Sequence, residues 1–551
     1  MRRFDDGSSS SNQKNLWAQY CGFLDFSMHK FMTVQERLLM EQLVLLSRTG
    51  LGKRFFAEKA PRSIDEFRAT VPLTTYSDYS AMLASKRDDL LPEKPSVWIR
   101  TAWEGGNHPV RYAPYTPSML ESYRNNLIAS MVLSTSTGRG KTALRPRDSI
   151  LCGMPPLPYE TGLLPHIFEG HLDLNFLPPM YAHESMSVAD AAELGLRLGL
   201  KNGIDLFFGM ASFACRLGDS FSLAEQKGGA SPHGEQRPQS EEERREVDGI
   251  SSRGAARMLR AIARAKAEKR KVKPADAFSL KGLVIAGTDS AVYKEKIRDQ
   301  WGITPHEVSG GAEATIVGTE TWAHNGLVFF PDSNFYEFIP EADMLKNAED
   351  PEFVPRTVLM NEIRSGENYE LVLTTLHGGA FVRYRLGDMY KCLKEKDREN
   401  GIDLPLLQYL DRVPNVIDIA GFTRITAETI DEALALSKLQ VSRYFAIKEH
   451  DSQKRPFMHI YIEMDEDAVY STASTANNIR EQLSVYFKYL ECEYGDLQQF
   501  FGRDPLVVDI LPSGCIDEYE NATGKSLRKV NPSRYDVIEL LRKLRPTTFF
   551  N

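Results

Sequence analysis

Leucines spaced three and four residues apart predict a long amphipathic helix near the start of the chain. They lie in VQERLLMEQLVLLSRTGLGKRFF, and we expect Gly50 and Gly52 to end this helix. Further helix starts are predicted by two capping pairs, Ser63 with Glu66 and Thr75 with Asp78. The first part of the chain is therefore expected to be helical.

Short apolar runs bounded by Gly and Pro then alternate with helical patterns from about residue 98 to residue 390. The runs are SILCGMPP, LNFLPPM, DLFFGM, GLVIAG and YELVLTTL. Runs of this kind are typical of buried strands in α/β layers. They predict a large α/β N-terminal domain over residues 16–413, with helices on layered β-sheets.

After residue 413 the pattern becomes that of a small α+β domain. TAETIDEALALSKL and ANNIREQLSVYFKYL predict helices, and PLVVDILP predicts a strand. FMHIYIEMD alternates apolar and other side chains, which predicts a strand covered on one face. We place a domain boundary near Pro414 and expect residues 414–551 to form a mobile lid.

Two segments lack the apolar positions that a core requires. They are the amino-terminal tail, residues 1–15, and an insertion at about residues 226–249, and we expect both to be disordered.

The segment at about residues 251–273 predicts a basic helix. It carries nine basic residues and one acidic residue from Arg253 to Lys273. It is either a docking helix for an anionic partner or a solvated helix with a thin packing stripe, and a charge run favours the second interpretation. The predicted stripe consists of Met258, Leu259 and Ile262.

Composition limits the classes of function. The 551 residues are 42% hydrophobic, and 67 basic against 75 acidic residues give a net charge of −8. This balance predicts no nucleic-acid partner, and no apolar run reaches the roughly 20 residues of a membrane span, so we expect a cytoplasmic protein. The six cysteines form no CxxC pair and no histidines stand at ligand spacing, so no structural zinc is predicted.

Two glycine turns follow predicted strands. GLVIAGTDS ends a strand at Gly287 and Thr288 before a helix, and α/β sheets bind ligands at such strand ends. In HEVSGGAEA, Gly310 and Gly311 permit close approach of the backbone to a ligand. Glu313 follows the bend, where a carboxylate can hold a magnesium ion on triphosphate oxygens.

FVRYRLGDMYKC predicts a strand that runs into a turn at Gly387 and Asp388. A carboxylate at a strand end can accept hydrogen bonds from both hydroxyls of a ribose. The alternative is an aspartate that caps local amides.

Two glycine turns carry a lysine that could contact a phosphate or another ligand. STSTGRGKT has Thr135 where a P-loop needs glycine, so it does not predict phosphate binding. ENATGKSLRKV presents Lys525 on an exposed turn, either without a function or as a cation that reaches another site.

In their order along the chain these motifs resemble the adenylate-forming ligase superfamily, which includes acyl-CoA synthetases and luciferases. VPLTTYSDYSAML and YRLGD are most similar to the auxin-responsive acyl-amido synthetases and their bacterial relatives. DSILCGMPP and LNFLPPM are similar to segments of the phenylacetate–CoA ligases. The resemblance covers most of residues 35–535.

The resemblance implies an enzyme that uses ATP and Mg²⁺. It would join ATP to a small carboxylic acid and pass the acyl group to an amine or to the thiol of coenzyme A. Lys525 would steady the α-phosphate, Asp388 would hold the ribose, and Glu313 would bind Mg²⁺. The other implied nucleotide contacts are Gly287, Thr288, Gly310, Gly311 and Arg412. The substrate would lie in a cleft between the two domains, with Asp388 at its floor and Lys525 in its lid.

The loop RTAWEGGNHPVRY departs from the family pattern SSGTTGxPK. Gly105 and Gly106 stand at the threonine positions and are the remaining candidates for phosphate contact. Glu104 occupies the position of the first glycine in the family pattern, and its negative charge would repel a triphosphate.

Three further departures support an alternative function. Ser309 stands where the family has an adenine-stacking tyrosine, Ala312 where it has a hydroxyl residue, and Pro414 at the hinge. The alternative is a catalytically degenerate protein on the same fold, which binds a nucleotide or an acyl group in a regulatory role.

Overall fold

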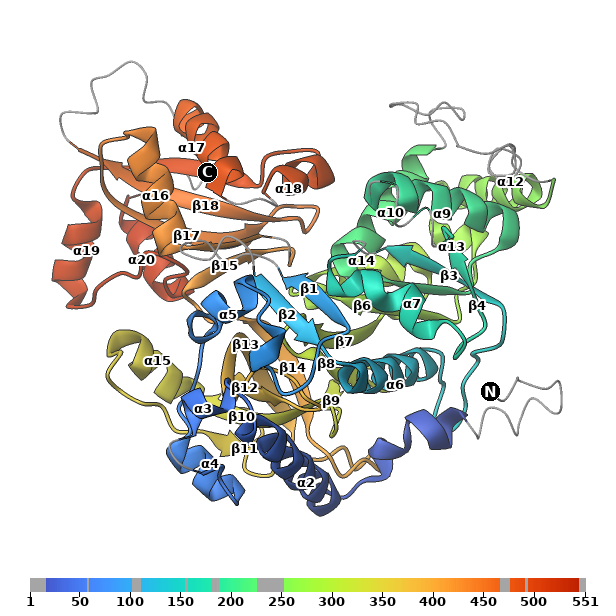
Figure 1. The fold of residues 1–551 in the computed structure, drawn as a ribbon. Helices are drawn as coiled ribbons and strands as arrows, with labels where there is room; N and C mark the ends of the chain where they lie inside the picture. The colour runs from blue at the N-terminus through green and yellow to red at the C-terminus, as the bar shows by residue number, and fades with distance from the viewer. Residues whose placement is uncertain are drawn as a thin grey trace. The chain divides into compact units, whose positions relative to one another are not determined.

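The computed structural model describes most of the chain, in the ranges 16–56, 59–101, 111–153, 157–179, 182, 186, 188–224, 252–421, 423–465, 476–490 and 494–544. The predicted tail, the predicted insertion and the candidate residues Gly105 and Gly106 lie outside these ranges. The chain divides into two compact units (Figure 1). Unit 1 comprises residues 1–101 and 112–410, and unit 2 comprises residues 102–111 and 411–551.

Unit 1 is a mixed α/β structure. Its strands are β1 (Val97–Thr101), β2 (Arg111–Tyr115), β3 (Asp148–Gly153), β4 (Leu174–Leu177), β5 (Leu206–Met210), β6 (Gly282–Ala286), β7 (His306–Gly311), β8 (Thr315–Glu320), β9 (Leu327–Phe329), β10 (Asn334–Pro340), β11 (Val358–Leu359), β12 (Asn368–Thr375), β13 (Tyr384–Lys394) and β14 (Leu406–Arg412). The five apolar runs form β3, β4, β5, β6 and β12, as predicted.

The helices of unit 1 connect these strands. They are η1 (Gly22–Asp25), α2 (Met28–Ser47), α3 (Gly52–Phe55), α4 (Ile64–Thr70), η2 (Tyr76–Asp78), α5 (Ser80–Ala84), η3 (Asp88–Leu90), α6 (Pro117–Ser134), η4 (Glu160–Leu163), α7 (Leu164–Phe168), α9 (Val188–Asn202), α10 (Ala211–Ala224), α12 (Ser252–Ala267), α13 (Pro274–Ala277), α14 (Ser290–Trp301) and α15 (Glu341–Glu349). Both predicted capping pairs are present, at Ser63 and at Thr75.

One large sheet organises unit 1. Its strand order is β11-β10-β12-β13-β14-β9-β8-β7-β6-β5-β3-β4. The strands from β4 through β3, β5 and β6 to β7 are parallel, and β7 turns back into β8 as an antiparallel hairpin. Helix α9 packs on β3 and β4, and α6 packs on β6 and β8 (Figure 1). Because β4 and β5 lie on opposite sides of β3, the chain reverses its direction across the sheet at β3, a position where α/β proteins bind ligands.

The predicted end of the first helix is wrong. Helix α2 ends at Ser47, whereas Gly52 begins α3. A Cβ atom at Gly52 would collide with the carbonyl oxygen of Leu46. Glycine is therefore required here by the close approach of two helices and not as a cap.

The basic segment forms a helix as predicted, and its predicted packing stripe is wrong at Leu259 only. Met258 and Ile262 are half-buried, whereas Leu259 is 67% exposed. The fully buried residues of α12 are small: Gly254, Ala261 and Ala265. The small residues are spaced by seven and four positions, two turns and one turn, so they share one face, and Leu259 points away from it.

Unit 2 contains two small sheets and five helices in the described residues. Its elements are β15 (Val416–Ile419), β16 (Thr423–Thr426), α16 (Ala427–Ser437), β17 (Val441–His450), β18 (Pro456–Met464), α17 (Ala476–Leu490), α18 (Tyr494–Phe501), β19 (Leu506–Leu511), α19 (Cys515–Thr523) and α20 (Arg534–Leu544). The sheet order is β17-β18-β19.

The expectation that the FMHIYIEMD strand has one covered face is wrong. Strand β18 is the central strand of its sheet, and both of its faces are covered. Ile460 and Ile462 pack into one core with Leu483 of α17, and Tyr461 packs on the other side into a second core with Ile516 of α19. Apolar cover on both faces explains why even the aromatic Tyr461 is buried in this strand.

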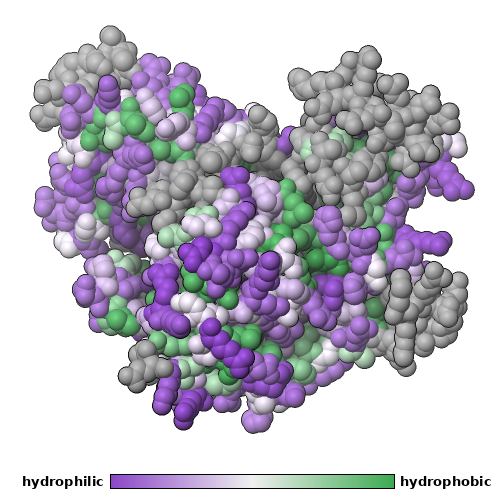
Figure 2. Space-filling model, viewed as in Figure 1, coloured by the Kyte–Doolittle hydropathy of each residue, from purple (hydrophilic) through white to green (hydrophobic). Residues whose placement is uncertain are grey.

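Hydrophilic residues are interspersed with small hydrophobic patches over the visible face of the molecule (Figure 2). None of the helices in the described part of the chain has both the length and the hydropathy needed to cross a membrane.

A buried ion pair fixes the amino-terminal helices of unit 1 to the large sheet. Arg383 donates from Nε and Nη2 to the carboxylate of Glu337, at 3.0 and 2.8 Å, and from Nη1 to the carbonyl oxygen of Arg68 at 2.8 Å. The side chains of Arg383 and Glu337 are only 7% and 1% exposed. The guanidinium therefore satisfies polar groups of a strand and a helix that are far apart in sequence.

Replacing Arg383 by methionine is expected to lower the free energy of unfolding by about 3–5 kcal/mol, because Glu337 would remain buried with its main partner gone. The matched control is Arg37→Met, since Arg37 and Glu41 form an exposed pair and its loss should cost less than about 1 kcal/mol. Urea unfolding followed by tryptophan fluorescence measures both variants. Equal losses in the two variants would contradict a structural role for the buried pair.

Candidate functional site

The turn after β6 lies at the carboxyl edge of the parallel strands. Gly287 has φ of +115°, a conformation that favours glycine, and a Cβ atom there would meet only open space. The hydroxyl of Ser290 donates to the carbonyl oxygen of Gly287 at 2.7 Å and fixes the turn into α14. Gly287 and Thr288 therefore occupy the strand end where the sequence predicts them.

The β7–β8 hairpin carries the second glycine pair. Gly310 lies opposite Ile316 and Gly311 opposite Thr315. A Cβ atom on Gly310 would lie 2.9 Å from the Cα atom of Ile316, whereas one on Gly311 would meet nothing within 4 Å. The neighbouring strand thus explains the glycine at 310, and only Gly311 presents open backbone.

Glu313 lies in the turn of this hairpin and is 3% exposed. The hydroxyl of Tyr123, on α6, donates to the carboxylate of Glu160, on η4. Burial raises the pKa of Glu160 to about 7, the bond from Tyr123 lowers it, and the negative charge of Glu313 raises it. The two carboxylates are thus close enough to repel each other.

Tyr115 of β2 completes this group, which we call the carboxylate cluster: Glu160, Glu313, Tyr115 and Tyr123. The rings of Tyr115 and Tyr123 are 6.2 Å apart, edge to face. The hydroxyl of Tyr115 is buried and has no hydrogen-bond partner among the described residues. Burial and then the charge of Glu160 raise its pKa well above the ordinary value. The cluster therefore combines negative charge with an unsatisfied polar atom.

Asp388 is placed by a bulge and not, as expected, by a turn at a strand end. Strand β13 begins at Tyr384 and continues past Asp388, so the predicted strand boundaries are wrong. Arg385 pairs with Val372 of β12, and Met389 pairs with Glu370. Three residues of β13, 386–388, therefore lie opposite one residue of β12, Leu371. Gly387, at φ of +79°, makes this bulge possible. Bulges re-aim side chains next to functional sites.

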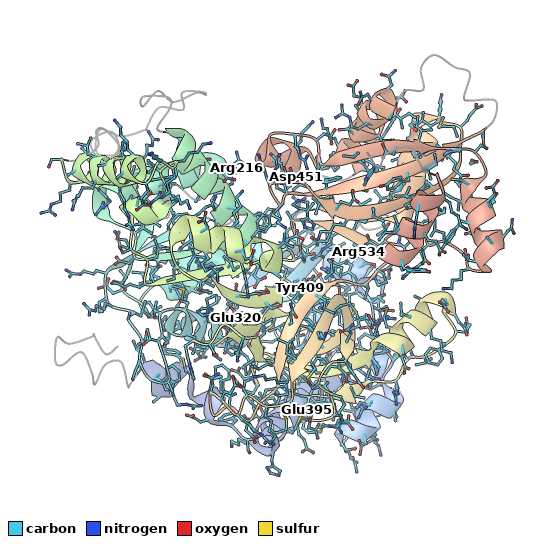
Figure 3. All side chains as sticks on the ribbon, turned by 180° about the vertical axis from the view of Figure 1, so that it is seen from behind. Arg216, Glu320, Glu395, Tyr409, Asp451 and Arg534 are labelled. Carbon is cyan, nitrogen blue, oxygen red and sulfur yellow. The ribbon has the colours of Figure 1, made fainter. Side chains whose placement is uncertain are left out.

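A hydrogen bond joins the end of β7 to β13. The hydroxyls of Ser309 and Tyr390 lie 2.6 Å apart, and Tyr409, labelled in Figure 3, packs against Tyr390 with 5.5 Å between ring centroids. Burial, and next the charge of Asp388, raise the pKa of Tyr390 well above its ordinary value. Within unit 1 the structure thus brings Asp388 near the Gly310–Gly311 hairpin.

The other charged candidates are described within their own units. Arg385 donates to both carboxylate oxygens of Glu370, at 2.8 and 2.6 Å, so its role is structural. Arg412 ends β14 and is 7% exposed, and it belongs to unit 2. Lys525 also belongs to unit 2, where it is exposed and follows Gly524 at the end of α19.

Sequence reasoning missed Glu160, Tyr115 and Tyr123 as site residues. They come from a helical turn, a strand and a helix, so no spacing in the sequence connects them. The only sequence feature that points to Glu160 is its place in the segment YET, residues 159–161, shortly after the apolar strand that ends at Gly153.

A family model for the GH3 family central domain matches residues 327–399, a range that includes Asp388 and ends before Arg412. No curated protein sequence matches the chain.

Solved structures resemble the fold over nearly the whole chain. The AtGH3.15 acyl acid amido synthetase in complex with 2,4-DB has a TM-score of 0.53 at 15% identity, and the match covers 99% of this chain and 98% of that one. The 2-hydroxyisobutyryl-CoA ligase in complex with 2-HIB-AMP and CoA also has a TM-score of 0.53 at 15% identity, covering 98% of this chain and 93% of that one. The predicted resemblance is thus confirmed for the fold over nearly the whole chain, and the family match is confined to residues 327–399.

Proposed function

We propose that this chain is an ATP-dependent ligase that activates a carboxylic acid as an acyl-adenylate and transfers the acyl group to an amine or to the thiol of coenzyme A. One observation carries the proposal. The carboxyl ends of β6 and β7 and the bulge of β13 gather Gly287, Gly311 and Asp388 within one unit, on a fold shared with an acyl acid amido synthetase and an acid–CoA ligase. The second of these was solved with an acyl-AMP and CoA.

Each candidate residue has a proposed role. The Asp388 carboxylate accepts hydrogen bonds from the ribose hydroxyls, and the open backbone at Gly287 and Gly311 lets the adenine ring approach. Thr288, Gly310 and Arg412 complete the proposed nucleotide contacts. Lys525 places a mobile ammonium on the charge that develops at the α-phosphate.

The carboxylate cluster fits an oxygen-ligated cation such as Mg²⁺. Glu313 would hold the ion, and its positive charge would relieve the repulsion that contributes to the raised pKa of Glu160. The buried Tyr115 hydroxyl offers a further oxygen for a water of the ion. When bound, MgATP would supply the adenylyl group: a carboxylate oxygen of the acid would bond to the α-phosphorus, the bond from that phosphorus to the β-phosphate oxygen would break, and pyrophosphate would leave.

Acid-dependent exchange of labelled pyrophosphate into ATP tests the proposal. We expect the purified chain to catalyse exchange with at least one acid of a panel of aryl and aliphatic carboxylic acids, and none without acid. Adding amino acids or coenzyme A then identifies the acceptor by product mass. Absence of exchange with every acid in the panel would overturn the proposal.

The alternative function, a nucleotide- or acyl-binding protein without turnover, is favoured by one observation. Ser309 replaces the stacking tyrosine of related sequences, and its hydroxyl is bonded to the buried Tyr390 instead of facing a ligand. Calorimetric binding of ATP with Mg²⁺, in the absence of any exchange, is the result expected from this alternative.

A further inference from the structure

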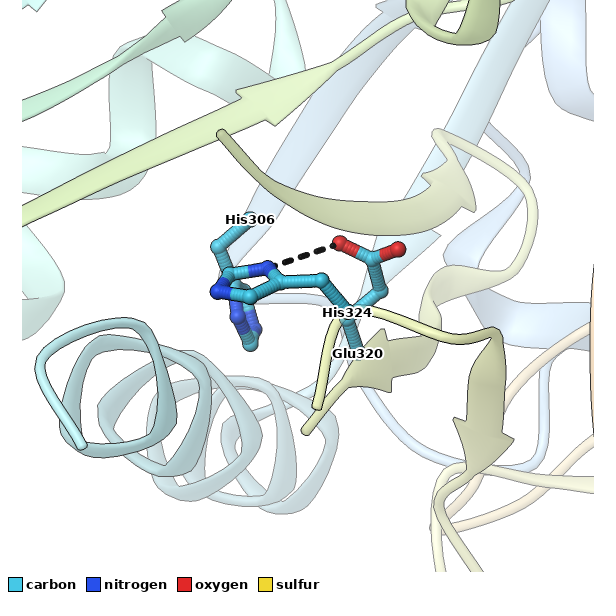
Figure 4. Close-up of side chains that lie close together, drawn as sticks. All are labelled: His306, Glu320 and His324. Carbon is cyan, nitrogen blue, oxygen red and sulfur yellow. Dashed lines mark hydrogen bonds and ion pairs between the residues drawn. The ribbon is translucent and has the colours of Figure 1, made fainter. Parts of the chain in front are cut away.

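Three potential metal ligands meet at one end of the β7–β8 hairpin. His306 is the first residue of β7, Glu320 is the last residue of β8, and His324 follows in the next turn. One ring nitrogen of each histidine and one carboxylate oxygen of Glu320 all lie within 4.8 Å of one another (Figure 4). Gly311 and Glu313 are at the other end of the same hairpin, so these ligands are separate from the proposed nucleotide site.

The hydrogen bonds of His306 leave one ring nitrogen free. Its Nε2 atom lies 2.8 Å from the hydroxyl oxygen of Thr319, and that hydroxyl donates its own proton to the carbonyl oxygen of Glu320 at 3.2 Å. Both contacts are satisfied together when Nε2 carries the proton and donates it. Nδ1 then holds a lone pair, and it has no hydrogen-bond partner in the described structure although His306 is fully buried.

The charges around Glu320 favour an additional cation. Lys294 forms ion pairs with Glu320 Oε1 and with Glu307 Oε2, both at 2.7 Å, so one ammonium faces two carboxylates. Glu320 Oε2 accepts from the backbone amide of Glu307 at 2.8 Å and has only a long contact of 3.4 Å with His324 Nδ1. This oxygen therefore faces His324.

We propose that His306 Nδ1, Glu320 Oε2 and a ring nitrogen of His324 bind a late first-row divalent metal ion such as Zn²⁺. Two imidazoles and one carboxylate are a common donor set for Zn²⁺, and three protein ligands leave a position for water. The His324 side chain is 25% exposed and gives the ion a path from solvent. The bound ion ties the turn that carries His324 to the sheet. The histidine spacing in the sequence does not match a known metal motif, because the ligands come from opposite strands of a hairpin.

Binding of Co²⁺ to the full chain, after treatment with a chelator, tests the proposal. We expect one equivalent of Co²⁺ to give the intense visible absorption of a low-coordinate nitrogen- and oxygen-ligated site, and Zn²⁺ to displace it. Zn²⁺ should also raise the melting temperature of the wild type. These readouts do not depend on enzymatic activity, so they are independent of the proposed function.

The variants His324→Asn and His306→Ala should each lower the affinity more than the roughly 10- to 100-fold that changes outside the ligand set produce. His324→Asn alters a partly exposed side chain and keeps the test valid if the buried His306→Ala fails to fold. The control His29→Asn changes an exposed histidine elsewhere and should bind as the wild type does. Absence of stoichiometric metal in the wild type, or unchanged binding by folded His324→Asn, would overturn the proposal.

Discussion

Replacing Lys525 by alanine is expected to slow acid-dependent pyrophosphate exchange by about 100- to 1,000-fold, the usual cost of losing one group that stabilises transition-state charge. Lys525 is exposed on a turn after α19, with no ion pair that would hold it within unit 2 in the described structure, so its ammonium is available for a substrate. Because the side chain is exposed, folding should be unaffected. The exchange rate at saturating ATP, with the best acid of the panel, measures the loss.

The matched control for this variant is Lys488→Ala, which removes an exposed lysine from α17 of the same unit. Its exchange rate should equal that of the wild type. The second half-reaction, started from a synthetic acyl-adenylate, separates the two steps and should be less affected by Lys525→Ala. Full exchange activity in Lys525→Ala would remove the lysine from the proposed mechanism.

The Asp388→Asn variant is expected to bind ATP roughly 10- to 150-fold more weakly, which corresponds to the loss of about 1.5–3 kcal/mol from hydrogen bonds to a charged acceptor. The amide oxygen of asparagine still accepts, but it lacks the negative charge that strengthens bonds to the ribose hydroxyls. Calorimetry with ATP and Mg²⁺ measures the affinity directly. Competition by 2′-deoxy-ATP tests the contact with the ribose. The wild type should bind 2′-deoxy-ATP more weakly than ATP, whereas Asp388→Asn should bind the two with similar affinity.

Asp88→Asn is the control for Asp388→Asn, because Asp88 is an exposed aspartate of the same unit. If Asp388 only caps local amides, the alternative raised by the sequence, then Asp388→Asn would lower the melting temperature and leave ATP affinity unchanged. Measuring both quantities on each variant distinguishes the two roles.

Much of the large sheet could be predicted because strands buried on both faces need continuous apolar runs. β3, β5 and β6 are strands of this kind, and each was bounded by glycine, proline or a polar turn. The two glycine turns were found for the same reason, since each ends a recognisable strand. The resemblance to known ligases depended on the order of these short motifs.

The bulge at Gly387 could not be predicted, because it depends on the register of β13 against β12 and not on local sequence. The full cover of β18 likewise depends on helices that follow it in the chain. The carboxylate cluster joins residues from four separate segments, and only the three-dimensional arrangement reveals that Glu160 and Glu313 share one environment. Contacts of this kind arise from packing over long sequence separations.

A crystal structure with a non-hydrolysable acyl-adenylate analogue, such as an acyl-sulfamoyl adenosine, would show directly whether Asp388 holds the ribose of an adenylate. Both ribose hydroxyls should lie within about 3 Å of the Asp388 carboxylate, with the adenine against Gly287 and Gly311. An analogue bound elsewhere, or an Asp388 carboxylate turned away from the ribose, would contradict this expectation.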